Sequence, residues 1–237
     1  MEYAKNNIIG GINLSNICLE YDINAFIFSS SAAVYGEPTY NPIDEKHPLL
    51  PNNYYGFTKL AIENNLIWFS KLKNIRCALL RYFNASGYDH KGRVFGLESN
   101  PQNLIPRVME SAIGIKPHVN IFGNDYNTKD GTGVRDYIHV SDLAKAHIDA
   151  IEYIINKRKN LVINLGSETG YSVLEVINKT KKISKQRIKY KFKSRRPGDT
   201  DKIIADTSLA IDLIDWKPKY SDLGTIIQST WDVYNKD

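Results

Sequence analysis

The spacing of apolar and polar positions predicts alternating helices and strands in the first third of the chain. Apolar residues recur at helical spacing over Glu2–Tyr21 and Tyr54–Lys73, although Gly10–Gly11 weakens the first helix. Ala25–Ser30 and Cys77–Phe83 are instead short, continuously apolar runs. Such runs are typical of parallel strands that are covered on both faces. This region therefore predicts helix, strand, helix, strand.

The same alternation continues to the C-terminal end, with a glycine-rich loop through Gly133. The further predicted elements are helices over Leu104–Ile113, Ser141–Ile155 and Ser172–Ile183, strands over Val119–Phe122, Leu161–Leu165 and Ile188–Phe192, and two closing helices. This order favours an α/β fold, with a doubly wound parallel sheet and a smaller appended lobe.

Composition and length agree with a globular protein. A chain of 237 residues suffices for one large domain or a domain and a half, and no apolar run approaches the roughly 18 residues of a spanning helix. The first residues have the features of neither a secretory signal nor a transit peptide, so we expect a cytoplasmic protein without membrane association. Cys18 and Cys77 lie in apolar segments and are predicted to be buried, reduced thiols.

The net charge of +5 is concentrated between Lys179 and Arg196. Basic residues there alternate with Ile188, Tyr190 and Phe192, as in a strand with one solvated face. A solvated sheet edge accounts for this pattern, and so does an anionic small-molecule substrate. A nucleic-acid platform would also combine basic and aromatic residues, but this segment is short and carries no nucleic-acid motif. We therefore expect no nucleic-acid partner.

A glycine-rich nucleotide-binding turn is absent from the sequence. A dinucleotide-binding half opens with a strand, a glycine-rich turn and, about 20 residues later, an acidic residue for the ribose. Neither GxGxxG nor GxxGxxG occurs. Gly10–Gly11, Gly131–Gly133 and Gly166–Gly170 have other spacings, so we interpret them as turns and helix ends.

Tyr55 and Lys59 form the first pair with chemical potential. Their spacing of four residues places both side chains on one helix face. A neighbouring ammonium lowers the pKa of a phenol, so we expect Lys59 to make Tyr55 a usable base. Tyr153 and Lys157 have the same spacing without a serine-ended strand before them, and we interpret that pair as helix surface.

Serines at the end of the preceding strand complete a possible triad. The segment Ser29–Gly36 precedes the Tyr55 helix by one loop, so a hydroxyl can lie beside the phenol. The alternative is that the serines only end a strand and Tyr55 only packs. Both motifs in this order favour a Ser, Tyr and Lys arrangement.

Several longer segments are similar to a known family. They are Phe26–Gly36, Tyr55–Lys59, Leu79–Asn84, Ile121–Tyr126, Asp130–Val140 and Arg195–Asp199. Together they resemble the UDP-glucose 4-epimerases of the extended short-chain dehydrogenase/reductase type, and the resemblance runs along essentially the whole chain. Ala32 and Ala33 stand where the dehydratase relatives carry acidic residues.

The resemblance implies an isomerase that interconverts UDP-glucose and UDP-galactose, with NAD as a retained hydride carrier. Tyr55 would take the proton of the sugar 4-hydroxyl, Lys59 would hold the nicotinamide ribose, and Ser31 would steady the 4-oxygen. Asn6 and Phe83 match further cofactor-contacting positions.

The positions that match UDP-sugar contacts are Asn84, Asn103, Leu104, Phe122, Arg135, Arg196 and Asp199. Two guanidinium groups can fork onto a diphosphate, although a lone arginine is more often a surface charge. His139 is interpreted as a packed histidine, and no metal site is expected.

The resemblance also implies a domain organisation. We expect residues 1–100 to be the remainder of a partial Rossmann-like NAD-binding domain and residues 101–237 mainly a UDP-sugar lobe, with segments around 134–166 returning to the first domain. The helices Glu2–Tyr21 and Tyr54–Lys73 resemble a dimer-forming pair, so we expect a homodimer.

The chain departs from the family pattern at its start, which lies just before the helix preceding the fourth strand. We expect Phe26–Ser30 to be a free apolar edge and the isolated chain to bind NAD weakly. Ile203 matches a position that limits the size of the sugar, so the acceptance of N-acetylated substrates stays open. An inactive remnant that at most binds UDP-sugars, and another NAD-dependent nucleotide-sugar epimerase or dehydratase, are the alternatives.

Overall fold

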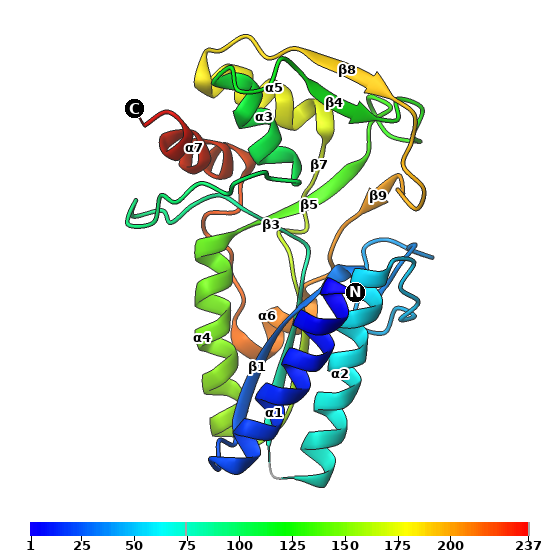
Figure 1. The fold of residues 1–237 in the computed structure, drawn as a ribbon, viewed down its shortest axis with the longest axis vertical. Helices are drawn as coiled ribbons and strands as arrows, with labels where there is room; N and C mark the ends of the chain where they lie inside the picture. Colours follow the sequence, from blue (N-terminus) through cyan, green and yellow to red (C-terminus); the bar gives the residue numbers. More distant parts are fainter. Residues whose placement is uncertain (74, 237) are drawn as a thin grey trace. The chain divides into compact units, whose positions relative to one another are not determined.

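The computed structural model describes residues 1–73 and 75–236, and their helices and strands divide into two compact units (Figure 1). Unit 1 comprises Met1–Phe83, Ala144–Leu165 and Ala205–Lys217. Unit 2 comprises Asn84–Leu143, Gly166–Ile204 and Pro218–Asp237. The chain thus crosses from one unit to the other several times. The compact units have other limits than the predicted domains: the first ends at residue 83, and both 144–165 and 205–217 return to it.

Unit 1 is built on three parallel strands in the order β1 (Ala25–Ser31), β2 (Arg76–Tyr82) and β6 (Leu161–Leu165). The helices α1 (Gly10–Glu20) and α2 (Tyr54–Leu72) lie side by side (Figure 1). Apolar side chains of both helices pack with those of β1 and β2 in one core cluster. The remaining helices are α4 (Val140–Lys157), which crosses between the units, and α6 (Ser208–Ile214). The predicted strands and the helix over Tyr54–Lys73 are confirmed.

β1 is an edge strand. It hydrogen-bonds β2 on one side, and its other side meets no strand of the described chain. Of its residues Ser30 alone is buried, and the others are half-buried. Within the described residues Phe26–Ser30 therefore lies at the edge of its sheet, and the expectation that this edge is free stays a prediction. Such an edge presents unpaired N–H and C=O groups, on which another chain can pair.

The first predicted helix begins as a π-helix. Ala4–Ile9 forms this wider turn, and α1 continues from Gly10. The side chain of Asn7 donates from Nδ2 to Thr58 Oγ1 at 2.9 Å, so the turn is tied to α2. A Cβ at Gly11 would lie 2.7 Å from Cδ1 of Ile62. The glycine therefore weakens the helix locally but permits its close packing on α2.

Unit 2 contains two small sheets. In one, β5 (Val134–His139) pairs with β3 (Asn84–Ser86), β7 (Gly170–Ser172) and β9 (Lys202–Ile203). The other pairs β4 (Val119–Phe122) with β8 (Tyr190–Lys193). The helices are α3 (Leu104–Ala112), α5 (Val173–Ser184) and α7 (Leu223–Tyr234). Their apolar faces form the core with β4 and β5, and this cluster includes Met109, Ile121, Tyr137, Ile177 and Ile227.

The sequence pattern missed β5, the strand that three others join. Its residues mix charged and apolar types, so neither alternation nor an apolar run marks it. The fold buries the Asp136 side chain by giving its carboxylate hydrogen bonds from Ser167 and Glu168. A polar residue can thus occupy a buried strand position when its partners are supplied.

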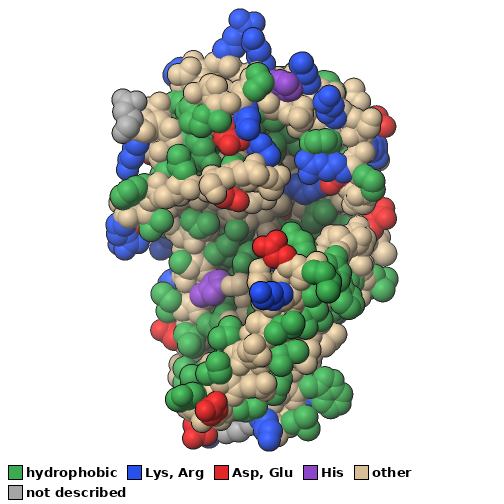
Figure 2. Space-filling view, in the orientation of Figure 1, with side chains coloured by type: hydrophobic (Ala, Val, Ile, Leu, Met, Phe, Trp, Pro, Cys, Tyr) green, Lys and Arg blue, Asp and Glu red, His purple; other side chains and the backbone are tan. Residues whose placement is uncertain are grey.

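The basic strand also differs from the prediction. β8 begins at Tyr190, and all four of its residues are exposed, so the expected single solvated face is wrong. In the described chain, β8 and β4 form a two-stranded sheet of their own. Figure 2 shows Lys and Arg side chains gathered over the part of unit 2 that carries these strands. Lysines on an exposed edge discourage pairing with other chains.

Among the described residues, no helix is both long and apolar enough to cross a membrane. Cys18 and Cys77 are buried free thiols, as predicted.

Candidate active site

The start of α2 is shaped to bring Tyr55 against the end of β1. Asn53 caps the helix by accepting from the Gly56 N–H at 2.9 Å. A Cβ at Gly56 would lie 2.2 Å from the carbonyl oxygen of Ala33. The first turn of α2 therefore approaches the segment after β1 more closely than any other residue would allow.

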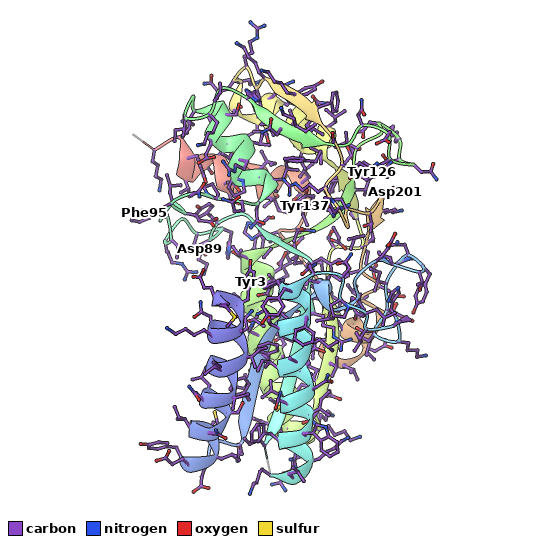
Figure 3. The ribbon with its side chains drawn as sticks, turned by 45° about the vertical axis from the view of Figure 1, so that its right-hand side comes forward. Tyr3, Asp89, Phe95, Tyr126, Tyr137 and Asp201 are labelled. Atoms are coloured by element: carbon purple, nitrogen blue, oxygen red, sulfur yellow. The ribbon has the colours of Figure 1, made fainter. Side chains whose placement is uncertain are left out.

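The Ser31 hydroxyl lies close enough to the Tyr55 side chain for a hydrogen bond between them to affect the pKa of Tyr55. Ser31 ends β1, and its Oγ also accepts from the Ala33 N–H at 3.2 Å. Burial raises the pKa of Tyr55 above its ordinary value, and the hydrogen bond with Ser31 acts in the opposite direction. The ring of Tyr3, which is labelled in Figure 3, packs near Tyr55. Its centroid lies 5.5 Å from that of the Tyr55 ring.

Lys59 points toward the same strand end. Its Nζ donates to the Ser29 carbonyl at 2.8 Å and lies 5.6 Å from the centre of the Tyr55 ring. Burial lowers the pKa of Lys59. The expectation that Lys59 lowers the pKa of Tyr55 is not met in this structure, because burial raises that pKa and the ammonium is directed to a backbone oxygen. The phenol therefore holds its proton here.

A buried polar network behind this site was not foreseen from the sequence. Glu63 binds Ser30 and Arg81, and Arg81 also binds Tyr35. All four residues are at most 4% exposed. A signal was present, because Arg81 interrupts an apolar strand and Glu63 follows Lys59 by one helical turn.

The other two positions expected to contact a cofactor also lie in unit 1. Asn6 is an exposed residue of the π-helical turn. Phe83 is 8% exposed and follows β2, with its N–H donating to the Leu165 carbonyl at 3.3 Å. Their roles stay predictions.

In unit 2, Arg135 lies on β5 beside two other positions singled out in the sequence. Its Nη1 donates to the carbonyls of Val134 and Thr200, each at 2.9 Å, and Nη2 lies 3.6 Å from a carboxylate oxygen of Asp199. Ile203 on β9 is its register partner. Backbone acceptors fix the guanidinium, so little side-chain entropy is left to lose when an anion binds.

Arg196 and Phe122 are also brought together. The guanidinium of Arg196 lies 3.8 Å from the centre of the Phe122 ring. Its neighbour Arg195 is bound differently: it donates to Asp125 at 2.7 Å and lies 3.9 Å from the centre of the Tyr126 ring. Arg195 also forms an ion pair with Asp201. Tyr126 and Asp201 are labelled in Figure 3. The two adjacent arginines thus have different surroundings.

Asn84, Asn103 and Leu104 complete the predicted substrate set. Asn84 donates from Nδ2 to the Asp136 carbonyl at 2.8 Å. Asn103 is the exposed N-cap residue of α3, without a side-chain capping bond, and Leu104 is the first residue of that helix. All the predicted substrate positions therefore lie in unit 2, and all the predicted catalytic and cofactor positions lie in unit 1.

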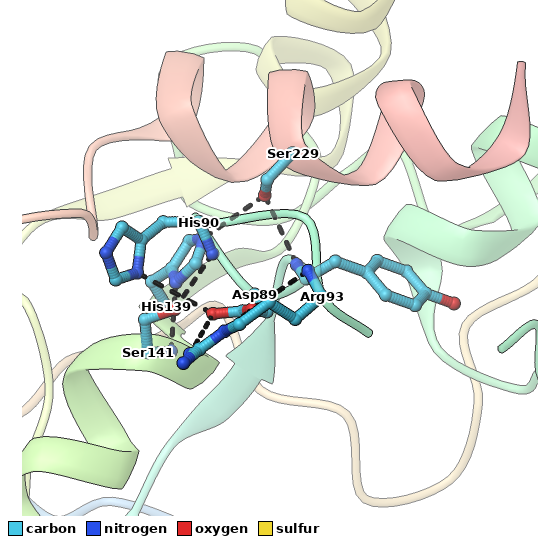
Figure 4. Close-up of polar contacts among 7 residues, drawn as sticks. Asp89, His90, Arg93, His139, Ser141 and Ser229 are labelled. Carbon is cyan, nitrogen blue, oxygen red and sulfur yellow. Dashed lines mark hydrogen bonds and ion pairs between the residues drawn. The ribbon is translucent and has the colours of Figure 1, made fainter. Parts of the chain in front are cut away.

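His139 forms a further polar cluster in unit 2 (Figure 4). Its Nδ1 accepts from the Ser141 N–H at 3.0 Å, so the ring proton is on Nε2, which donates to Ser229 Oγ at 3.1 Å. A histidine that donates to a serine cannot take its proton. Ser229 is therefore not an activated nucleophile, and the interpretation of His139 as a packed histidine is confirmed by its full burial. Within residues 1–73 and 75–236, no group of side chains is suited to hold a metal ion.

A parallel α/β sheet whose edge strand ends in a serine, with Tyr and Lys one helical turn apart beside it, defines an enzyme of the extended short-chain dehydrogenase/reductase class. The family model described as GDP-mannose 4,6 dehydratase matches residues 1–229. UDP-glucose 4-epimerases are more specific relatives. That of Halalkalibacterium halodurans is 42% identical over 231 residues, which cover 98% of this chain and 69% of the relative. That of Bacillus subtilis is 44% identical, over 92% of this chain and 65% of the relative.

Solved structures of UDP-glucose 4-epimerases are also similar to this chain. The UDP-glucose 4-epimerase from Brucella ovis in complex with NAD has a TM-score of 0.94 and 38% identity, over 98% of this chain and 71% of that one. The enzyme from Bifidobacterium longum in complex with NAD+ and UDP has a TM-score of 0.89 and 39% identity, over 98% and 70%. The chain belongs to the UDP-glucose 4-epimerase family.

Proposed function

We propose that the protein interconverts UDP-glucose and UDP-galactose through a 4-keto intermediate. The observation that carries the proposal is the arrangement of Ser31, Tyr55 and Lys59 at the end of β1. When bound, NAD would supply the acceptor for the hydride of sugar C4 and, as NADH, the donor for its return to the other face of C4. No net oxidation results.

Residues of this chain transfer the proton of the sugar 4-hydroxyl. Tyr55 accepts the 4-hydroxyl proton while the C4–H bond breaks, and donates it back when C4 is reduced. Ser31 holds the 4-oxygen through the hydroxyl that lies next to Tyr55. Tyr55 must be ionised before it can act as a base. Its raised pKa makes that step dependent on positive charge beside the phenol, which the Lys59 ammonium and a bound nicotinamide ring would supply.

The UDP-sugar would be held by unit 2. Arg135 and Arg196 offer two guanidinium groups to the diphosphate, each already braced, one by backbone carbonyls and one on an aromatic ring. Asn84, Asn103, Leu104, Phe122 and Asp199 would contact the nucleoside and the sugar. The support is that all seven residues belong to one compact unit.

The residues present fit part of the NAD molecule. Lys59 and Tyr55 offer a donor and a hydroxyl suited to the hydroxyls of the nicotinamide ribose, with Asn6 and Phe83 as further contacts. The 237 residues contain no GxGxxG turn for the pyrophosphate. The second candidate function is binding of UDP-sugars without turnover, which is supported by the two guanidinium groups of Arg135 and Arg196 in unit 2.

One preparation separates the two functions. The purified chain is denatured, the released NAD is measured by enzymatic cycling, and conversion of UDP-galactose to UDP-glucose is followed before and after addition of NAD. Turnover that is lost in Tyr55→Phe supports the epimerase. Tight binding of UDP with neither NAD nor turnover supports the second candidate. A product other than the C4 epimer would indicate another nucleotide-sugar epimerase or a dehydratase.

Substrate breadth is tested in the same assay. Ile203, beside Arg135 in the sheet, is of intermediate size for a position that would limit the N-acetyl group. A similar structure, 39% identical, is described as the UDP-Glc/GlcNAc 4-epimerase from Campylobacter jejuni. We propose that N-acetylated substrates are accepted more poorly than the plain hexoses, and that Ile203→Gly improves them.

We further propose a cytoplasmic homodimer joined through α1 and α2. Large apolar side chains stay exposed on both helices, among them Leu14 and Ile17 on α1 and Trp68 and Leu72 on α2. Figure 2 shows hydrophobic side chains over this part of unit 1. Sedimentation of the parent chain and of Trp68→Glu tests the dimer, which the charge should dissociate.

A further inference from the structure

On the face of the unit 1 sheet that packs against α2, the cross-strand pairs of β1 and β2 are apolar except for one pair. Alternate residues of a strand point to the same face, so the cross-strand pairs on the side of α2 can be followed in the register of β1 and β2. In order they are Phe26 with Cys77, Phe28 with Leu79 and Ser30 with Arg81. The first two levels pack in the apolar cluster with Ile62 and Leu66 of α2. The third level is polar, and it lies one residue before Ser31.

Glu63 of α2 joins the two strands at this polar level. Its Oε1 accepts from Ser30 Oγ at 2.5 Å and its Oε2 accepts from Arg81 Nη2 at 2.5 Å. Arg81 Nε adds a bond to Oε1 at 3.0 Å, so the pairing is bidentate. Glu63 and Ser30 are fully buried, and Arg81 is 4% exposed. The carboxylate therefore holds one helix to two neighbouring strands at once.

Further hydrogen bonds of Arg81 fix Tyr35, which follows Ser31 in the chain. Arg81 Nη1 donates to the Tyr35 hydroxyl at 3.2 Å, and that hydroxyl donates to Asn164 Oδ1 on β6 at 2.7 Å. Tyr35 immediately follows the short helix Ala32–Val34. Ser31 thus lies between Ser30, which is linked to Arg81 through Glu63, and Tyr35, which is bound to Arg81 directly.

A buried ion pair is an inefficient way to stabilise a core. Removing two charges from water costs several kcal/mol, and a well-packed apolar replacement is often as stable or more so. Apolar contacts, however, are non-directional, whereas hydrogen bonds fix distance and angle. A small shift of α2 along the sheet could be met by repacking of the apolar side chains, but it would break the bonds of Glu63. Tyr55 lies two turns before Glu63 on the same helix, so the shift would separate it from Ser31.

We propose that Ser30, Glu63 and Arg81 are positioning residues that set the register of α2 on β1 and thereby hold Tyr55 in contact with Ser31. The effect on turnover rests on the proposed epimerase function. The effect on the Tyr55 contact does not.

The first test is an apolar replacement that preserves the fold. The triple variant Ser30→Ala, Glu63→Leu and Arg81→Met removes every charged partner together, and Tyr35 keeps its bond to Asn164. We expect an unchanged or higher melting temperature, a kcat lowered about tenfold or more and a nearly unchanged KM for UDP-galactose, because the reacting groups are misplaced while substrate contacts remain. Ser30→Ala alone should show a smaller loss in kcat.

The second test does not depend on turnover. Tyr55 is titrated by NMR in chains with isotope-labelled tyrosine, its signal being assigned from Tyr55→Phe. The triple variant should titrate at higher pH than the parent, because the Ser31 bond lowers the pKa of Tyr55 and would be weakened. Ser70→Ala is the matched control, since it removes a hydrogen bond to Asn160 at the exposed end of the same helix.

The outcomes separate the two proposals. A parent chain without turnover contradicts the proposed function, while the titration still decides the positioning role. Parental kcat and a parental Tyr55 midpoint in the triple variant would overturn that role, and so would an equal shift in Ser70→Ala.

Discussion

The two compact units hold their functional side chains in different ways. In unit 1, Tyr55 and Lys59 are half-buried and rest on a network of buried hydrogen bonds. In unit 2, Arg196 is exposed and lies on an aromatic ring, and Arg135 is braced by carbonyls. Groups that move a proton need fixed geometry and a low dielectric, whereas groups that receive a diphosphate must stay accessible to it.

Removal of the phenol should give the largest effect. Tyr55→Phe is expected to lower kcat by about 10²–10⁴-fold, because general acid–base catalysis contributes that much, with UDP binding unchanged. Coupled epimerase kinetics and calorimetry measure the two quantities. Tyr153→Phe is the control, because Tyr153 has a lysine at the same spacing outside the site. Equal losses in the two variants would contradict the assignment.

Shortening a core side chain in one unit should destabilise mainly that unit. Leu79→Ala in unit 1 and Ile177→Ala in unit 2 each remove a side chain that is at most 1% exposed, at a cost of about 2–5 kcal/mol in the free energy of unfolding. Hydrogen exchange should show the loss of protection mainly in the unit that carries the change. Equal loss in both units would mean that they unfold as one.

The arginines of unit 2 should differ in binding. Arg196→Met is expected to weaken UDP binding by about 1.5–3 kcal/mol, the usual worth of a hydrogen bond to a charged group. Arg195→Met should change it little, because that guanidinium is already bound to Asp125 and Tyr126. Isothermal titration with UDP checks both. A larger effect from Arg195 would reverse the assignment of the two residues.

The smallest effect concerns pH. Burial lowers the pKa of His139 below its ordinary value of 6.5. The unfolded chain therefore binds a proton first as pH falls, and stability should decrease from about pH 6.5 down to the folded pKa and level off below it. His139→Gln should reduce this slope in denaturant titrations across that range. An unchanged slope would assign the pH dependence to other groups.

The sequence by itself determined most of the elements and the pairing of Tyr55 with Lys59. Helical periodicity and apolar strands are local properties, and a spacing of four residues fixes a common helix face wherever the helix lies. The motifs also singled out Arg135, Asp199 and Ile203, which the fold places side by side.

Only the tertiary structure decided the rest. β5 is a strand because distant partners satisfy Asp136, which no local pattern reveals. The pKa of Tyr55 rises rather than falls because burial, a property of the packed chain, exceeds the lowering by the Ser31 hydrogen bond. Glu63 and Arg81 are 18 residues apart in the sequence, and they form their ion pair only because α2 packs on β2. Charges and hydrogen bonds act through space, and their balance is set once the chain is folded.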